Sequence, residues 1–144
     1  IEMGHVAGSE LDGRTIPYDN SLEGLVSKKK DFIGKRSLNR TAFVAEDRQK
    51  VVGVVPIDKK TSIPEGSHLV KDAKAKLPNP KLGHVSASCW SVEYNNPFSL
   101  AILHDGKNMI GQKLFALSPL KNKSIPVEIV SSHYVDPKGE RVRS

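Results

Sequence analysis

The sequence predicts a mainly β protein, in which a six-stranded antiparallel β-barrel follows a short α/β lead segment. Two observations favour this fold class. After residue 49, six short apolar or alternating segments are separated by clusters of turn-forming residues, with no helical period between them. The chain has 144 residues, 38% of them hydrophobic, which is enough for one compact core. Short strands without intervening helices fit a closed barrel, because closure leaves no exposed strand edge.

The first fifty residues carry weaker signals than the rest. Residues 1–20 are punctuated by glycines and by Pro17, so we expect irregular structure there. Residues 21–27 fit either a short strand or the end of a helix, and a segment this short does not show which. Residues 31–42 predict a helix that Asp31 would cap, with an apolar face formed by Phe32, Ile33, Leu38 and Ala42.

Six strands are expected behind this lead segment. Valine-rich or alternating stretches place them at Lys50–Pro56, Ser67–Lys71, Leu82–Ser91, Phe98–His104, Gln112–Ser118 and Ser124–Val135. The turn clusters between them lie at residues 58–64, 77–80, 94–97, 104–106 and 119–122. We therefore divide the chain into a lead domain, residues 1–50, and a barrel domain, residues 51–144.

The third of these strands has a clear alternation of apolar and polar residues. A period of two predicts that one row faces the core, namely Val85, Ala87 and Cys89. The other row would face outward or toward the lead segment, namely His84, Ser86 and Ser88. Cys89 would then be a buried and unreactive thiol.

Charge and motif content exclude several functions. The net charge of +6 is spread along the chain, whereas nucleic-acid binders usually concentrate basic residues with aromatic ones. The five histidines never stand four residues apart, and the loop at residues 106–113 lacks the Ser/Thr of a phosphate-binding loop. We expect no catalytic constellation and no metal site in this chain.

The lone Cys89 excludes an internal disulfide and indicates a reducing compartment, so we expect a cytoplasmic protein without a membrane helix. The chain starts at Ile1 without an initiator methionine or a leader, which we interpret as the start of a piece of a longer protein.

A series of sequence words carries a family resemblance. They are IEMG at residues 1–4, DGRTIP at 12–17, DFIGKRSL at 31–38, GHVSAS at 83–88 and YVDPKGER at 134–141. Together they resemble the C-terminal part of the aminomethyltransferase (glycine-cleavage T-protein) family, over nearly the whole chain. The DPKGER ending is most similar to the branch formed by the alpha subunits of heterotetrameric sarcosine oxidases.

This resemblance implies that the barrel is a six-stranded Greek key and that residues 1–50 end a folate-binding domain. It places Glu2 where the family binds the pterin ring of tetrahydrofolate. It also makes Lys30 and Arg141 candidates for contacts with the anionic glutamate tail. The catalytic residues, and the FAD, FMN and NAD sites, would lie elsewhere in the intact enzyme.

The resemblance further implies partners and an activity. The partners would be the missing upstream part of the same alpha subunit and the other sarcosine oxidase subunits, with no nucleic acid and no membrane. The intact enzyme would demethylate sarcosine oxidatively and pass the one-carbon unit to tetrahydrofolate. The chain alone would be inactive.

Three alternatives stay open at this point. The chain could come from a glycine-cleavage aminomethyltransferase, whose partner would be a lipoyl carrier protein. It could be a basic barrel that binds RNA, which predicts binding that weakens steeply with salt. It could also be a structural module that docks subunits, with Trp90, Tyr94 and Phe98 as interface anchors.

Overall fold

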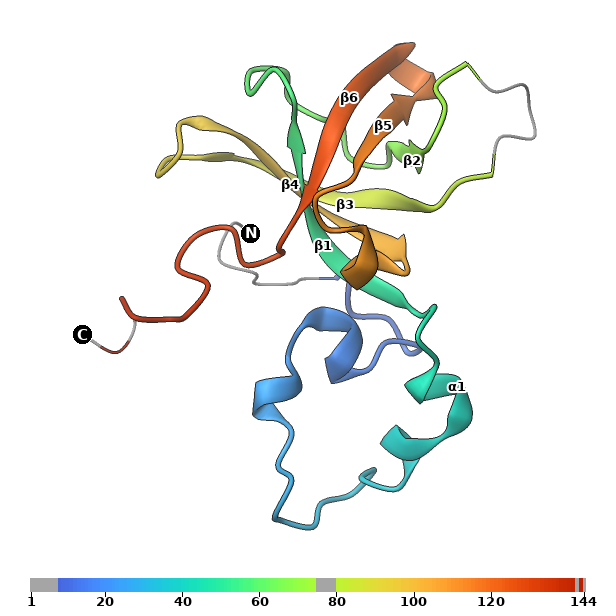
Figure 1. The fold of residues 1–144 in the computed structure, drawn as a ribbon, viewed down its shortest axis with the longest axis vertical. Helices are drawn as coiled ribbons and strands as arrows, with labels where there is room; N and C mark the ends of the chain where they lie inside the picture. The colour runs from blue at the N-terminus through green and yellow to red at the C-terminus, as the bar shows by residue number, and fades with distance from the viewer. Residues whose placement is uncertain (1–7, 75–79, 142, 144) are drawn as a thin grey trace.

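A closed barrel of six antiparallel strands forms the centre of the computed structural model, which describes residues 8–74, 80–141 and 143 (Figure 1). The strands are β1 (Gln49–Pro56), β2 (His68–Val70), β3 (Gly83–Ser91), β4 (Asn96–His104), β5 (Lys113–Ser118) and β6 (Lys123–Val130). Around the barrel their order is β1-β4-β3-β2-β5-β6, and β6 pairs again with β1. Strands β2, β3 and β4 are neighbours in sequence and in space, and β1 lies beside β4. This order is a Greek key, so the predicted fold class is confirmed.

All six strands lie where the alternation predicts them, with differences at their ends. The largest difference is in the last strand, which ends at Val130 instead of Val135. Its pairing with β1 ends where Val130 lies opposite Gly53. A Cβ atom on Gly53 would lie 2.4 Å from the Ser131 carbonyl oxygen. Only glycine therefore lets the backbone after β6 pass this close to β1. Of the expected turns, residues 77–79 lie outside the described residues.

The predicted side-chain parity of β3 is correct for its first half and wrong for its second half. Val85 packs in the barrel interior, as expected. A β-bulge between Val85 and Ala87 then reverses the alternation. Ala87 and Cys89 consequently pack on the outer face of the barrel, and Ser88 turns inward and hydrogen-bonds Ser99. Cys89 is therefore half-buried on the outside of the barrel rather than part of its interior.

The helix predicted over residues 31–42 is absent. This segment contains turns, the 3-10 helix η3 (Ser37–Asn39) and the start of the four-residue helix α1 (Thr41–Val44). Gly34 has a φ of 94°, which no α-helix accommodates. None of these residues is buried, so the apolar face has nothing to pack against, and packing is what stabilises most helices in proteins.

Four further 3-10 helices lie outside the strands in the described residues. The lead segment contains η1 (Pro17–Asn20) and η2 (Glu23–Leu25), the latter within the segment that fitted either a strand or a helix end. Loops of the barrel contain η4 (Gly106–Met109) and η5 (Pro119–Lys121). In Figure 1 the part of the lead segment from η1 to α1, coloured blue to cyan, forms a lobe below the barrel. The chain then continues from this lobe into β1. The division into two domains at residue 50 stays a prediction.

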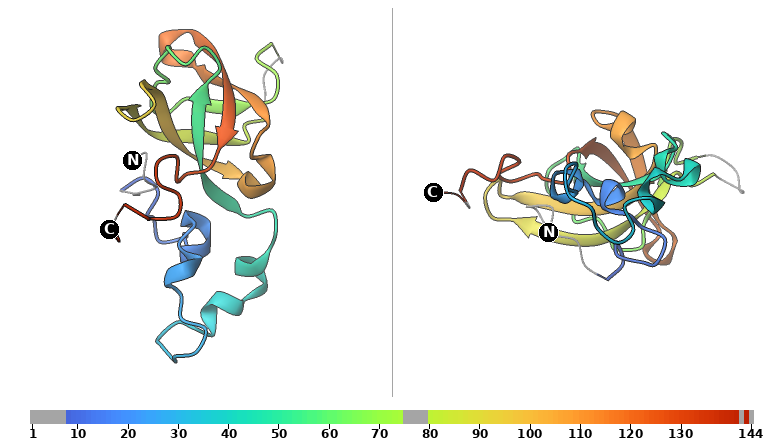
Figure 2. Two further views of the ribbon diagram at one scale, coloured as in Figure 1. Left: turned by 60° about the vertical axis from the view of Figure 1, so that its left-hand side comes forward. Right: turned by 90° about the horizontal axis from the view of Figure 1, so that it is seen from below.

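Two apolar clusters stabilise the barrel. The first fills its interior with side chains from all six strands, from Met109 and from Ile63. The second lies on the outer face of β1 and β4 and consists of Val51, Val55, Phe98, Leu100 and Ile102. The chain after β6 covers part of this outer cluster, because the Tyr134 ring stacks on Phe98 with ring centroids 4.8 Å apart. Figure 2 shows this red tail on the side from which the β3–β4 hairpin projects.

The burial of Phe98 in the outer cluster contradicts part of one alternative, in which Trp90, Tyr94 and Phe98 anchor a partner subunit. Phe98 is fully buried and cannot anchor a partner protein on the surface. Trp90 and Tyr94 on the same hairpin are about half exposed, at 52% and 51%.

Candidate ligand-binding cleft

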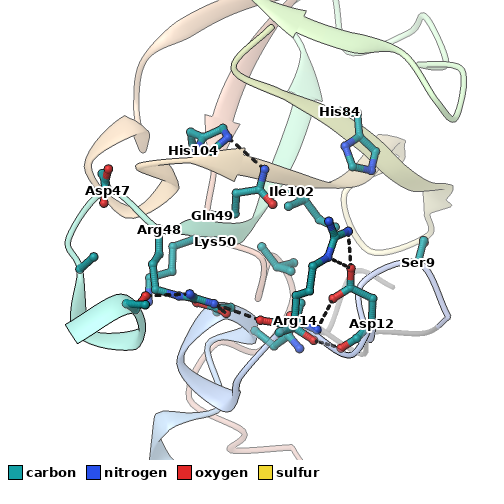
Figure 3. A pocket seen from close by; sticks show the side chains of 16 residues that line it. Ser9, Asp12, Arg14, Asp47, Arg48, Gln49, Lys50, His84, Ile102 and His104 are labelled. Atoms are coloured by element: carbon teal, nitrogen blue, oxygen red, sulfur yellow. Dashed lines mark hydrogen bonds and ion pairs between the residues drawn. The ribbon is translucent and has the colours of Figure 1, made fainter. Parts of the chain in front are cut away.

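A cleft of about 420 Å³ lies between the lead segment and the outer face of the barrel (Figure 3). Its barrel wall is built from outward-facing positions of three strands: Gln49 and Val51 of β1, His84 of β3, and Ile102 and His104 of β4. The pairing of β4 with β1 and β3 brings these positions together, because Gln49 lies opposite His104, and Ile102 opposite both Val51 and His84. The volume lies within the range of small-molecule sites.

The opposite wall is fixed by a partly buried ion pair between Arg48 and Asp19. The Arg48 Nε donates to Asp19 Oδ1 over 3.0 Å, and Asp19 Oδ2 also accepts from the Ile16 backbone N–H. Arg48 further donates to the carbonyl oxygens of Ala42 and Arg14, and its guanidinium lies 5.1 Å from the centre of the Phe43 ring. The hydrogen bond with Asp19 raises the pKa of Arg48. Arg48, directly before β1, thus joins η1 and residues 42–43 of the lead segment at the start of the barrel.

A second ion pair lies at the mouth of the cleft. The Arg14 Nε and Nη2 atoms donate to Asp12 Oδ2 over 2.8 and 2.6 Å. The side-chain hydrogen bond from Arg14 lowers the pKa of Asp12. Because the Arg14 side chain is 91% exposed, water screens this pair strongly, and a carboxylate ligand could replace Asp12 as the partner of Arg14.

Two histidines on the barrel wall, His84 and His104, carry hydrogen-bonding groups beside Gln49. The His104 Nε2 lies 3.1 Å from the side-chain nitrogen of Gln49. His84 has a lowered pKa, chiefly because it is partly buried and also because Lys81 and His68 lie nearby, while Glu10 acts in the opposite direction. The lowered pKa favours the neutral imidazole form of His84, which can donate one hydrogen bond and accept one.

The lowered pKa of His84 leads to a prediction about pH. In an NMR titration its midpoint is expected below the ordinary value of 6.5. The folded state then binds the proton less tightly than the unfolded state does, so the contribution of His84 to stability is lost as the pH falls below about 6.5. Lys81→Met should move the midpoint upward but not fully to 6.5, because burial remains. A wild-type midpoint at or above 6.5 would contradict this description of the cleft.

Two of the three sequence-predicted site residues, Lys30 and Arg141, do not line this cleft. Glu2 lies outside the described residues. Lys30 is exposed in the loop that follows η2, where its backbone N–H donates to the Ser27 hydroxyl. Figures 1 and 2 show that loop in the part of the lobe away from the barrel. Arg141, in the tail, forms a two-fold pair with Glu93 of the β3–β4 hairpin, at 2.7 and 3.1 Å, which raises its pKa. Lys30 and Arg141 are not brought together.

Sequence reasoning missed most of the residues that line the cleft. It expected His84 to face outward or toward the lead segment, which is where it lies. It gave no role to Gln49 or His104, which only the pairing of β1 with β4 brings together from 55 residues apart in sequence. It also gave no role to Arg48, whose partner Asp19 lies 29 residues away. Within the described ranges no group of three or more His, Cys, Asp or Glu side chains could hold a metal ion. No helix among the same residues is long and apolar enough to span a membrane.

Comparison with solved structures defines the class of fold. The chain matches the crystal structure of glycine cleavage system aminomethyltransferase T from Bartonella henselae with a TM-score of 0.73 and 19% sequence identity, over 94% of this chain and 37% of that one. The barrel with its lead segment therefore has an aminomethyltransferase-like fold. No protein-family model matches the sequence.

The sequence relatives indicate a narrower class of protein than the likeness of fold does. Homologues of this chain are sarcosine oxidase alpha subunits: 38% identity over 99% of the chain for the protein of Rhizobium meliloti (strain 1021), and 36% and 34% over 94% for those of Corynebacterium sp. strains U-96 and P-1. The chain spans only 14% of the length of each of these relatives.

Proposed function

We propose that this chain forms one wall of the tetrahydrofolate site in the alpha subunit of a sarcosine oxidase. In that enzyme, tetrahydrofolate would accept the one-carbon unit released by oxidative demethylation of sarcosine. The observation that carries the proposal is the 38% identity to a sarcosine oxidase alpha subunit over 99% of the chain. The likeness to an aminomethyltransferase supports the folate part of it. Because that likeness has only 19% identity, the relatives favour an oxidase over a glycine-cleavage enzyme.

Each predicted site residue has a chemical role in this proposal. The edge of the pterin ring presents two parallel N–H donors, and the carboxylate of Glu2 would accept both. The ammonium group of Lys30 would pair with carboxylates of the glutamate tail. Arg141 would serve the same tail by exchanging Glu93 for a folate carboxylate, which its exposed position at the protein surface allows. In this proposal the chain contributes binding groups, and bond breaking takes place elsewhere in the enzyme.

The rest of the reaction would take place outside this chain. Flavins and NAD, bound in other parts of the intact enzyme, would supply the oxidation chemistry. The partners would be the upstream part of the same polypeptide and the other subunits of the oxidase. The names of the relatives, each a subunit alpha, support an assembly of several subunits.

The proposal is tested on the intact enzyme by following where the one-carbon unit goes. Sarcosine is oxidised with and without tetrahydrofolate, and formaldehyde and methylene-tetrahydrofolate are assayed together. Saturating tetrahydrofolate is expected to replace formaldehyde by methylene-tetrahydrofolate. Formaldehyde release that tetrahydrofolate does not change, together with no measurable folate binding, would refute the proposal.

Lys30 gives a graded prediction for the same enzyme. Lys30→Met should weaken binding of a folate with a long glutamate tail by about twofold to fivefold, the effect of one exposed ion pair. The difference should vanish at 1 M salt, where such pairs are screened. Lys121→Met, at an exposed lysine of η5 in the barrel, is the matched control and should leave the affinity unchanged. Equal affinities for the two variants at low salt would remove Lys30 from the site.

A further inference from the structure

The ion pair between Arg141 and Glu93 has the geometry with which an arginine binds a free carboxylate. The Arg141 Nη2 and Nη1 atoms donate to the two carboxylate oxygens of Glu93 over 2.7 and 3.1 Å. Arginine commonly holds a carboxylate through such a fork of two parallel hydrogen bonds. Glu93 therefore occupies the end of the guanidinium on which a carboxylate ligand would bind in the same way.

The tail is held beside the β3–β4 hairpin by contacts that do not involve this ion pair. The centre of the Tyr134 ring lies 4.8 Å from that of Phe98 and 4.6 Å from that of Tyr94. The Tyr134 hydroxyl also accepts a hydrogen bond from the Asn96 side chain over 3.2 Å. A substitution of Glu93 should therefore leave the tail in place.

The backbone of Arg141 is fixed by a loop that Asp136 closes. One carboxylate oxygen of Asp136 accepts from the Glu140 backbone N–H over 2.8 Å, and the other accepts from the Arg141 N–H over 3.0 Å. The carbonyl oxygen of Asp136 accepts from the Gly139 N–H over 2.9 Å. Arg141 is thus held by its own loop, whichever carboxylate its side chain binds.

The exposure of the pair allows one carboxylate to replace another at Arg141. The Arg141 and Glu93 side chains are 61% and 42% exposed. Water screens a pair of this kind, so it is weak enough for a ligand to displace Glu93. The hydrogen bonds from Arg141 lower the pKa of Glu93, so its carboxylate stays ionised near neutral pH and competes for the guanidinium.

We propose that Glu93 is a built-in competitor of the ligand at Arg141, which lowers the affinity of the site for the carboxylate tail of a folate. The inference rests on the proposed function, in which Arg141 contacts that tail. Glu93 weakens only the contact at the tail and leaves the contacts of the pterin ring unchanged. A folate bound in this way dissociates more readily, as a one-carbon acceptor that leaves as product must.

The test compares the affinities of intact wild type and Glu93→Gln for tetrahydrofolate with a long glutamate tail. Glutamine keeps the size of the side chain but carries no charge, so it competes less for Arg141. The variant should bind about twofold to fivefold more tightly at low salt, and this gain should vanish at 1 M salt. Glu140→Gln is the matched control, because it removes an exposed charge beside Arg141 that is not part of the pair. It should change the affinity by less than Glu93→Gln does.

Two further measurements distinguish competition from a structural effect. A tetrahydropterin without the glutamate tail should bind wild type and Glu93→Gln equally, because it presents no carboxylate to Arg141. In an Arg141→Met background, Glu93→Gln should give no gain. Four results would each overturn the proposal: an unchanged affinity in Glu93→Gln, an equal gain in Glu140→Gln, a gain with the tail-free ligand, or a gain without Arg141. A wild type that binds no folate would refute the proposed function as well, so the two failures are distinguishable.

Discussion

Replacing Phe98 with alanine should lower the free energy of unfolding by about 3–5 kcal/mol, the range for truncation of a fully buried phenylalanine. Phe98 has no exposed surface and belongs to the outer cluster, between the barrel and the tail. Its ring stacks on Tyr134, whose hydroxyl accepts a hydrogen bond from Asn96 over 3.2 Å. The substitution therefore removes apolar contacts and also releases the tail that carries Arg141.

Urea unfolding of wild type and variant, followed by tryptophan fluorescence of Trp90, measures this loss. Leu120→Ala is the control, since its side chain is fully exposed and its removal should change the free energy by less than about 0.5 kcal/mol. Similar values for the two variants would show that the outer cluster does not stabilise the fold.

In the intact enzyme, Glu2→Gln is expected to weaken tetrahydrofolate binding roughly 30-fold to several hundred-fold, which corresponds to about 2–4 kcal/mol. The substitution keeps the size of the side chain but replaces one acceptor oxygen by an N–H donor. That donor would face a donor of the pterin, so one hydrogen bond is lost and a repulsive contact is gained. Glu2 is the residue on which the folate proposal depends most.

The effect of Glu2→Gln on the products separates folate binding from oxidation. Oxidation of sarcosine at a distant flavin should stay nearly unchanged. At tetrahydrofolate concentrations that saturate only the wild type, the one-carbon unit should leave the variant as free formaldehyde. A variant that loses sarcosine oxidation as well would indicate a general structural defect instead.

The strands could be predicted because their pattern is local. Each valine-rich or alternating segment indicates a strand wherever it lies, and six of them without helices favour closure. The bulge in β3 is different, because nothing in residues 83–91 alone shows where the extra residue lies. It appears only when β3 pairs with β4, and it reverses the facing of every residue from Ala87 onward.

The cleft and the irregular structure of residues 31–42 could not be predicted from the sequence, for a related reason. The cleft depends on partners far apart in sequence, such as Gln49 with His104 and Arg48 with Asp19. The predicted helix failed because its apolar face lacks a packing partner within the described chain, which periodicity alone does not reveal. The residues named from the family resemblance, Glu2, Lys30 and Arg141, stay predictions.

Titration of the intact enzyme with tetrahydrofolate, as wild type, Glu2→Gln and Glu128→Gln, tests the folate proposal most directly. Glu128 is an exposed residue of β6, so its substitution controls for the loss of one surface charge. The proposal predicts that wild type and Glu128→Gln bind with the same affinity and that Glu2→Gln binds at least about 30-fold more weakly. Equal affinity in all three proteins would contradict it and leave the likeness of fold without the folate site.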